Sequence, residues 1–177
     1  LPGGYIFVNY GLIEKAETPE EVAGVLAHEI QHVLKRHGLK NVVGRAGIGL
    51  ILGLLLGDLE GLGGLIIGAS SELAALSFSR EQEEEADALG LDLLYAAQID
   101  PSGLPSFFEK LAAEQASKGT ALPSFLSTHP DTSQRIRVLT AAIESRGQGE
   151  GRRFAFSWEA ARAGCEPVSR TDPDAAP

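Results

Sequence analysis

Apolar residues recur at helical spacing early in the chain and predict a buried helix. The apolar positions are Val22, Val25, Leu26, Ile30, Val33 and Leu34. The run follows Thr18 and Pro19, with Glu21 three residues after the threonine, a pattern typical of a capped helix start. Gly38 follows a cationic stretch and suits a helix end. The pattern therefore predicts a helix over about Pro19–His37.

Four other segments carry patterns that predict regular structure. Alternation over Tyr5–Asn9 predicts a strand, which could form or support the edge where an extended substrate pairs. An apolar-rich stretch predicts a second helix from Ser71 to about Gln98. Asp100 and Pro101 are predicted to open a third helix. A fourth helix is predicted over about Thr132–Ser145.

Length and charge limit the classes of partner. The chain has 177 residues and a net charge of −9, which argues against nucleic acid or an anionic membrane surface as electrostatic partners. We predict one domain over residues 1–146, followed by a linker and tail over residues 147–177 with an aromatic patch that could dock on the domain or on a partner. The chain begins within a motif, without an initiator methionine or signal peptide, so we expect a fragment or processed product.

Residues 44–69 form a segment rich in leucine, isoleucine and glycine. Its uncharged runs are shorter than the roughly 20 residues that cross a bilayer as a helix. Glycines at positions 49, 53, 57 and 61 predict a smooth helical stripe that permits close packing. The segment is therefore interpreted as a mobile helical hairpin or lid that covers the candidate metal cleft described below and offers apolar surface to an unfolded chain. A buried structural hairpin is an equal alternative, and a hairpin that dips into a membrane is a third.

The candidate chemistry centres on residues 28–32, His-Glu-Ile-Gln-His, inside the first predicted helix. Residues four apart on a helix share a face, so His28 and His32 can bind one metal ion. Glu29 can reach a water molecule at that metal, as the general base does in zinc peptidases with this spacing. The alternative is two ordinary, partly buried histidines. His37 lies about 140° further round a regular helix than His32 and is predicted not to reach the metal.

A hydrolytic zinc site needs a third protein ligand and one open position. The downstream candidates are His129, Cys165 and the acidic residues 81–87. Glu83 and Asp87 share a helical face, so a glutamate could bind the metal while the aspartate supports a ligand histidine. From the residues alone, Glu81 or Glu84 could be the metal ligand instead of Glu83. Alternatively, none of the acidic residues binds a metal, and the cluster is simply a solvent-exposed acidic helix face.

Four ordered motifs resemble a known family. They are Pro-Gly-Gly-Tyr-Ile-Phe-Val at 2–8, His-Glu-Ile-Gln-His-Val leading to Arg-His at 28–37, Ser-Arg leading to Glu-Glu-Glu-Ala-Asp at 79–87, and Ser-Thr-His-Pro leading to Arg-Ile at 127–136. Together they resemble the zinc metallopeptidase family that includes the CAAX prenyl proteases, the HtpX-like membrane proteases and the BepA-like periplasmic proteases, over about residues 1–143.

The resemblance implies a fold, a location and residue roles. The implied fold is mainly α (α+β), a glutamate-zincin metallopeptidase fold with a small β-sheet beside the active-site helix. Glu83 falls on the third zinc ligand, and Asp87 and Arg135 fall on supporting positions. His129 falls on a histidine near the zinc that stabilises the transition state or masks the metal. The location expected from the relatives is the cell envelope, periplasmic or membrane-associated.

The sequence thus predicts a zinc-dependent endopeptidase that cleaves unfolded or misfolded envelope proteins. One Zn²⁺ per chain is expected on His28, His32 and Glu83, with Glu29 as general base and His129 stabilising the oxyanion. The alternative from another class is a zinc-containing chaperone with latent proteolysis. A third interpretation is a structural zinc with His129 as fourth ligand. The natural substrate, the cleavage preference and the oligomeric state do not follow from the sequence.

Overall fold

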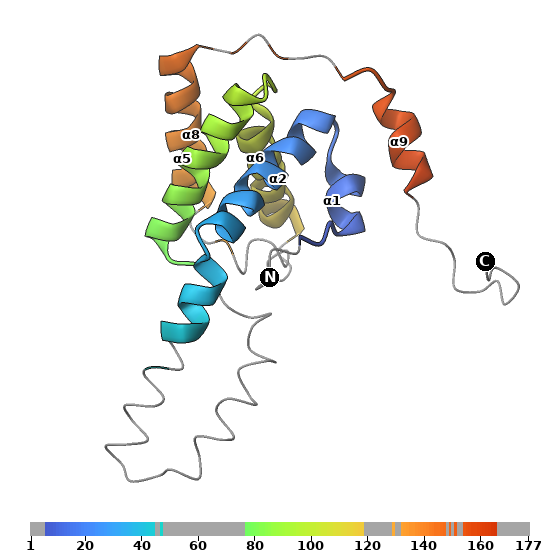
Figure 1. The fold of residues 1–177 in the computed structure, drawn as a ribbon. Coiled ribbons are helices and arrows are strands. Elements are labelled where there is room, and N and C mark those ends of the chain that lie inside the picture. Colours follow the sequence, from blue (N-terminus) through green and yellow to red (C-terminus); the bar gives the residue numbers. More distant parts are fainter. Residues whose placement is uncertain are drawn as a thin grey trace, which may run out of the picture.

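The structure is a computed structural model, and it describes residues 6–44, 47, 77–118, 129, 132–147, 149, 151 and 154–165. Within these residues the protein is mainly helical, as predicted (Figure 1). The helices are α1 (Tyr10–Lys15), α2 (Pro19–Leu34), α5 (Arg80–Ala96), α6 (Gly103–Lys118), α8 (Thr132–Arg146) and α9 (Trp158–Gly164). Helix α2 packs against α5 and α6, and α8 packs against the same two helices.

Helix α2 begins as the sequence predicts but ends earlier. The Thr18 side chain accepts a hydrogen bond from the Glu21 N–H, and Pro19 is the first helical residue. The helix ends at Leu34 rather than at His37, because Arg36 adopts a left-handed conformation with φ of 56°. Residues 37–44 then form a second helical segment. Gly38 therefore lies inside a helix and does not end one.

Helices α5 and α6 both start later than predicted. Ser79 and Gln82 form a reciprocal capping box, in which each side chain bonds the other residue's backbone, so α5 begins at Arg80. Residues 77–79 are not helical, and residues 71–76 lie outside the described part of the chain. Asp100 accepts a hydrogen bond from the Ser102 N–H in a turn, which delays α6 to Gly103. Helix α8 lies close to its predicted range.

The main core lies where α2, α6 and α8 meet. Its buried members are Ala16, Val25, Leu104, Phe107, Phe108, Leu111 and Leu139. Two glycines allow the helix axes to approach closely. A Cβ atom at Gly24 would lie 2.7 Å from the backbone nitrogen of Leu104, and one at Gly90 would lie 3.2 Å from the backbone nitrogen of His28. The Gly90 contact holds α5 directly against the turn of α2 that carries the histidines.

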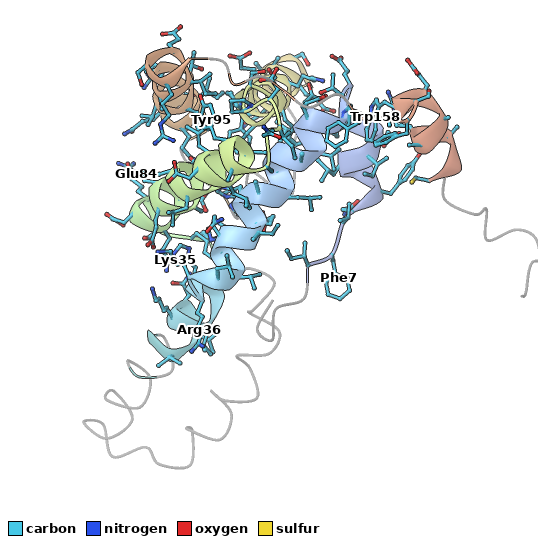
Figure 2. The ribbon with its side chains drawn as sticks, turned by 45° about the horizontal axis from the view of Figure 1, so that its top comes forward. Phe7, Lys35, Arg36, Glu84, Tyr95 and Trp158 are labelled. Carbon is cyan, nitrogen blue, oxygen red and sulfur yellow. The ribbon has the colours of Figure 1, made fainter. Side chains whose placement is uncertain are left out.

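The strand expected over Tyr5–Asn9 is not seen. Residues 6–9 have no regular structure and are exposed, Tyr5 lies outside the described residues, and the described residues contain no strand. Phe7 is 78% exposed (Figure 2). Asn9 instead caps α1 by accepting a hydrogen bond from the Gly11 N–H. An alternating sequence forms a strand only where a neighbouring strand completes its hydrogen bonds, and the described residues supply none.

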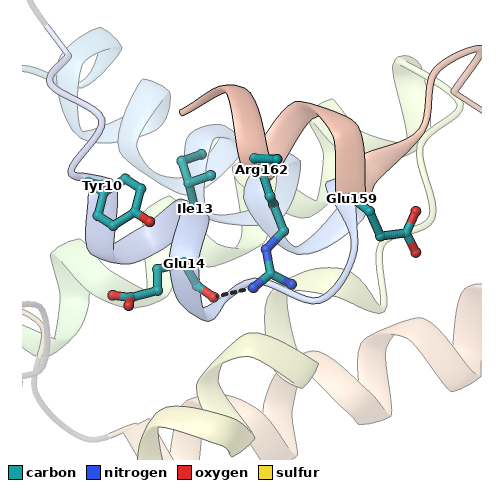
Figure 3. A pocket seen from close by; sticks show the side chains of 6 residues that line it. Tyr10, Ile13, Glu14, Glu159 and Arg162 are labelled. Carbon is teal, nitrogen blue, oxygen red and sulfur yellow. Dashed lines mark hydrogen bonds between the residues drawn. The ribbon is translucent and has the colours of Figure 1, made fainter. Parts of the chain in front are cut away.

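Part of the predicted tail packs on the domain. Within residues 147–177, α9 lies against α1, and Trp158 donates a hydrogen bond to the Ala16 carbonyl. Arg162 donates one to the Glu14 carbonyl (Figure 3). A small cavity between the two helices is lined by Tyr10, Ile13, Glu14, Glu159, Arg162 and Ala163. Trp158 also packs against the core. The sequence did not decide whether the aromatic patch docks on the domain. In the structure, Trp158 of that patch does so.

The segment over residues 44–69 lies outside the described residues except for positions 44 and 47. The predicted hairpin or lid is therefore not described. Among the helices that the structure does describe, none combines the length and the apolar character needed to cross a bilayer.

Candidate metal centre

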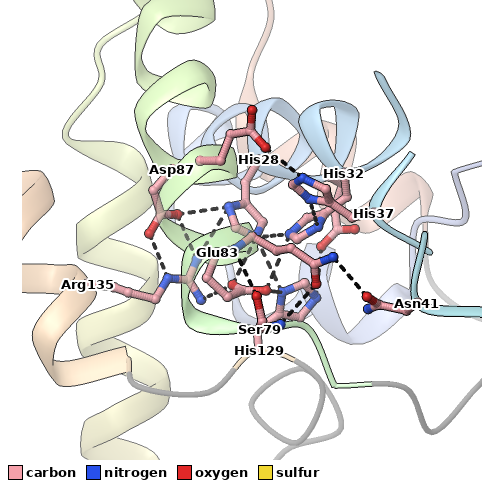
Figure 4. A network of polar contacts seen from close by, with 12 residues as sticks. His28, His32, His37, Asn41, Ser79, Glu83, Asp87, His129 and Arg135 are labelled. Carbon is pink, nitrogen blue, oxygen red and sulfur yellow. Dashed lines mark hydrogen bonds and ion pairs between the residues drawn. The ribbon is translucent and has the colours of Figure 1, made fainter. Parts of the chain in front are cut away.

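Two histidines of α2 point into the interior from one face of the helix. His28 and His32 are 0% and 5% exposed, and their Nε2 atoms lie 3.0 Å apart. The helical spacing of four residues produces this arrangement, as the sequence predicts. Both rings lie at the contact between α2 and α5 (Figure 4).

Helix α5 brings a carboxylate to the two histidines. Glu83 is 1% exposed, and its carboxylate oxygens lie 3.4 Å from His28 Nε2 and 3.4 Å from His32 Nε2. Its neighbours Glu81 and Glu84 are exposed, because the face of α5 that packs on α2 is the one that carries Glu83 and Asp87. Of the acidic residues left open by the sequence, Glu83 is the one that meets the histidines.

His129 completes a group of four side chains. Its Nδ1 atom lies 2.8 Å from Glu83 Oε1 and 3.3 Å from His28 Nε2, and its Nε2 atom lies 3.3 Å from Glu29 Oε1. One donor atom from each of His28, His32, Glu83 and His129 falls within 4.8 Å of the others. Among the described residues, Cys165 is not in this group and is exposed at the end of α9.

The distances fit a four-coordinate metal ion. Ligands about 2.0–2.1 Å from a tetrahedral zinc lie about 3.3–3.4 Å from one another. The separations from His28 Nε2 to Glu83 Oε2 and to His129 Nδ1 are 3.4 Å and 3.3 Å, and that from His32 Nε2 to Glu83 Oε1 is 3.4 Å. The separations between the two Nε2 atoms and from His129 Nδ1 to Glu83 Oε1 are shorter, at 3.0 Å and 2.8 Å. Nitrogen and carboxylate oxygen are ligands that zinc accepts, so the residues present can hold a metal ion of this kind.

The Glu83 carboxylate also has a cationic partner within the site. Its buried Oε2 atom forms an ion pair with Arg135 Nη1 at 2.5 Å and lies 3.4 Å from His28 Nε2. An ion pair of this kind favours the ionised form of the carboxyl group.

Asp87 and Arg135 form hydrogen bonds that hold His28 in place. His28 Nδ1 lies 2.9 Å from Asp87 Oδ1, and Arg135 donates two hydrogen bonds of 2.7 Å to the Asp87 carboxylate. Burial raises the pKa of Asp87, but the hydrogen bonds from Arg135 and His28 outweigh it and hold the pKa below its ordinary value. Asp87 is therefore ionised at neutral pH and accepts the Nδ1–H of His28. In the neutral ring this leaves the lone pair of His28 on Nε2. Burial lowers the pKa of His28, but hydrogen bonds with Asp87 and Glu83 outweigh it and raise the pKa above its ordinary value, so a metal ion at Nε2 competes with a proton on this ring.

The protonation states of His32 and Glu83 suit metal binding. Burial, partly offset by the contact with Glu83, lowers the pKa of His32 to about 4. Burial raises the pKa of Glu83, but hydrogen bonds from His129, His28 and His32 outweigh it, so the net shift is downward. At neutral pH, Glu83 is a carboxylate and His32 is a neutral imidazole. Metal binding requires these forms.

His37 is the residue that sequence reasoning missed. It does not belong to the four-residue group, as predicted, but it is 1% exposed and its Nδ1 atom lies 3.0 Å from His32 Nδ1. The Phe78 ring packs against His32, with ring centroids 3.9 Å apart. All four histidines of the chain therefore gather at this site. A third histidine close behind the motif was the available signal, and the assumption of a continuous helix concealed it.

The chain is similar in sequence to several known proteins. Residues 1–143 match the model of peptidase family M48. The chain is 35% identical over 139 residues to mitochondrial metalloendopeptidase OMA1 of Schizosaccharomyces pombe, covering 78% of this chain and 41% of that protein. It is 37% identical to the Arabidopsis thaliana protein of the same name, covering 80% and 28%. It is 31% identical to the beta-barrel assembly-enhancing protease of Yersinia pestis, covering 76% and 29%. The chain thus spans less than half the length of these relatives.

Proposed function

The chain belongs to peptidase family M48, and from this premise we propose that it is a zinc-dependent endopeptidase that cleaves unfolded or misfolded proteins. As a member of that family, the domain is a metalloprotease. The metal, the residue roles, the substrates and the location belong to the proposal. The observation that carries it is the convergence of His28, His32 and Glu83, with a neutral imidazole and an ionised carboxylate facing one point.

In this proposal His28, His32 and Glu83 hold one zinc ion. When bound, zinc lowers the pKa of a water molecule toward about 7 and polarises the scissile carbonyl. Asp87 and Arg135 orient His28 through the hydrogen bonds described above. The reaction also needs a general base that is not a metal ligand, and Glu29 is the candidate for this role.

Glu29 is proposed as the general base. It lies on α2 next to His28, its side chain is 29% exposed, and its carboxylate is 3.3 Å from His129 Nε2. It therefore borders the ligand group without belonging to it. From this position Glu29 takes a proton from the attacking water and passes it to the leaving amine. The His129 ring, on the same side, is the candidate donor to the developing oxyanion.

The proposal also includes a fold, a site of substrate contact and a cellular location. The helical arrangement around the motif supports a glutamate-zincin fold, with the exposed backbone of residues 6–9 as the edge that pairs with an extended substrate. The names of the similar proteins, a mitochondrial metalloendopeptidase and a beta-barrel assembly-enhancing protease, support an envelope or membrane-associated location. The domain is proposed to span residues 1–146.

The test is cleavage of an unfolded protein by the zinc-loaded chain. Reduced, carboxymethylated lactalbumin is incubated with the protein, and the products are followed by mass spectrometry. We expect cleavage that a chelator such as 1,10-phenanthroline abolishes and that stoichiometric zinc restores, because the nucleophile is activated at the metal. Cleavage that persists in the metal-free protein would contradict the proposal.

The position of His129 favours a second candidate, a zinc-containing chaperone whose proteolysis is latent. The His129 ring contacts Glu83, His28 and Glu29, so it fills the side of the group where water would enter. Replacing His129 by alanine distinguishes the roles. Proteolysis rises if the ring masks the metal and falls if the ring aids catalysis. The protein loses zinc and unfolds if the ring is a structural ligand. Thermal unfolding with and without zinc, beside the cleavage assay, separates these results.

A further inference from the structure

The two candidate ligand histidines are supported from different sides of the site. His28 Nδ1 lies 2.9 Å from the Asp87 carboxylate, an arrangement that the spacing on α5 predicted. His32 Nδ1 instead lies 3.0 Å from His37 Nδ1. His37 is 1% exposed and also lies 2.9 Å from Glu85 Oε2 (Figure 4). Each histidine therefore has a partner on the ring nitrogen that faces away from the metal group.

A break in the helix brings His37 into this position. On a continuous helix, a residue five positions after His32 would point about 140° away from it. Helix α2 ends at Leu34, and Arg36 has a φ of 56°, which is uncommon for a residue other than glycine. Such a conformation is unfavourable for a residue with a side chain and persists where the surroundings hold it. The contacts of His37 with His32 and Glu85 are those surroundings.

The contacts fix which ring nitrogen of His37 and of His32 carries the hydrogen. The Lys35 ammonium lies 2.9 Å from Glu85 Oε1, an ion pair in which Glu85 is a carboxylate that only accepts hydrogen bonds. The His37 Nε2 atom that faces it must carry a hydrogen. In the neutral ring, His37 Nδ1 is then an acceptor. His32 therefore donates its Nδ1–H to His37, and its lone pair lies on Nε2, facing Glu83.

We propose that His37, held by Glu85, is a positioning residue that fixes the tautomer and ring orientation of His32 for metal binding. The inference rests on the proposed function, since it assigns a role toward the proposed zinc. It adds His37, which contacts the candidate ligand His32 but is not itself one of the four residues of the group, and which comes from the segment after the helix break. Partners of this kind usually contribute about 10–100-fold in metal affinity.

The test is zinc affinity measured by competition with a chromogenic chelator. The His37→Phe variant keeps a ring of similar size but has no acceptor, and its zinc Kd is expected to rise by about 10–100-fold. The His37→Gln variant, whose amide oxygen can accept the Nδ1–H of His32, is expected to recover most of that loss. A merely structural role would not give this rescue.

Two further measurements keep the test decisive if His37→Phe folds poorly. Glu85→Gln changes a side chain that is 40% exposed, so the fold should survive, and zinc affinity is expected to fall several-fold. Glu84→Gln is the matched control, because Glu84 is exposed on the same helix, and its affinity should equal that of wild type. ¹⁵N spectra of the zinc-free protein should show the Nδ1–H tautomer of His32 in wild type and a mixture in Glu85→Gln.

The outcomes separate this inference from the proposed function. Wild-type zinc affinity in both His37→Phe and Glu85→Gln would overturn the role of His37 while leaving zinc-dependent cleavage intact. The same affinity in Glu85→Gln alone, with His37→Phe unfolded, would also overturn it. Wild-type protein that binds no zinc would overturn both. Weakened affinity in the two variants, with an unchanged Glu84→Gln control, would support the inference.

Discussion

Replacing Glu29 by glutamine is expected to abolish peptide hydrolysis while leaving zinc bound. The carboxylate of Glu29 lies 3.3 Å from His129 but is not among the four groups that surround the metal position. Glutamine has nearly the same shape and cannot accept a proton from water. Losing a general base costs about 10²–10⁴-fold in rate. Cleavage of unfolded lactalbumin and zinc content by atomic absorption are measured on the same samples.

The control for this variant is Glu20→Gln, which removes a partly exposed glutamate from the first turn of the same helix. Its cleavage rate should remain at the wild-type level. Full proteolysis by Glu29→Gln would show that another group takes the proton. Loss of zinc from Glu29→Gln would show instead that Glu29 is a ligand.

Replacing Arg135 by methionine is expected to have the largest effect on stability. Arg135 is 4% exposed, donates two hydrogen bonds to Asp87, contacts Glu83 and lies 4.6 Å from the centre of the Phe108 ring. Its removal leaves two buried carboxylates without their cation. Breaking a buried pair in this way typically costs about 3–5 kcal/mol. Urea unfolding of the zinc-free protein at pH 7 measures the loss.

The dependence of this loss on pH follows from the pKa of Asp87. The folded-state pKa of Asp87 lies below its ordinary value of 3.8, so its pairing with Arg135 contributes stability that is present above that pH and is lost as the pH falls further. The difference between wild type and Arg135→Met should therefore be largest at neutral pH and shrink in acid. Arg137→Met, at an exposed position on the same helix, is the control and should unfold like wild type. An equal loss in both variants would contradict the buried role of Arg135.

Much of the helical framework could be predicted because its signals are local. The Thr18 cap and the periodic apolar positions after it indicate α2, and the spacing within α2 places His28 beside His32. Glu83 could be selected over its neighbours only through the resemblance of the motifs. The structure gives the physical reason, since Gly90 lets α5 approach α2 at His28 and thereby turns one acidic face inward.

The features that the sequence did not predict depend on contacts between distant residues. Arg36 leaves the helical conformation where His37 gains His32 and Glu85 as partners, and no propensity of arginine signals this. The alternating residues around Phe7 suggested a strand, but pairing with another strand is not a property of the segment itself. Helix α9 likewise depends on Trp158 reaching the Ala16 carbonyl.

The central claim is that side chains from α2 and α5 hold one metal ion, and zinc-edge anomalous diffraction tests it most directly. For crystals grown with stoichiometric zinc, we expect a single strong peak about 2.0–2.2 Å from His28 Nε2, His32 Nε2 and a carboxylate oxygen of Glu83. A crystal without a peak at this position, or with a zinc ion bound there without Glu83, would contradict the claim.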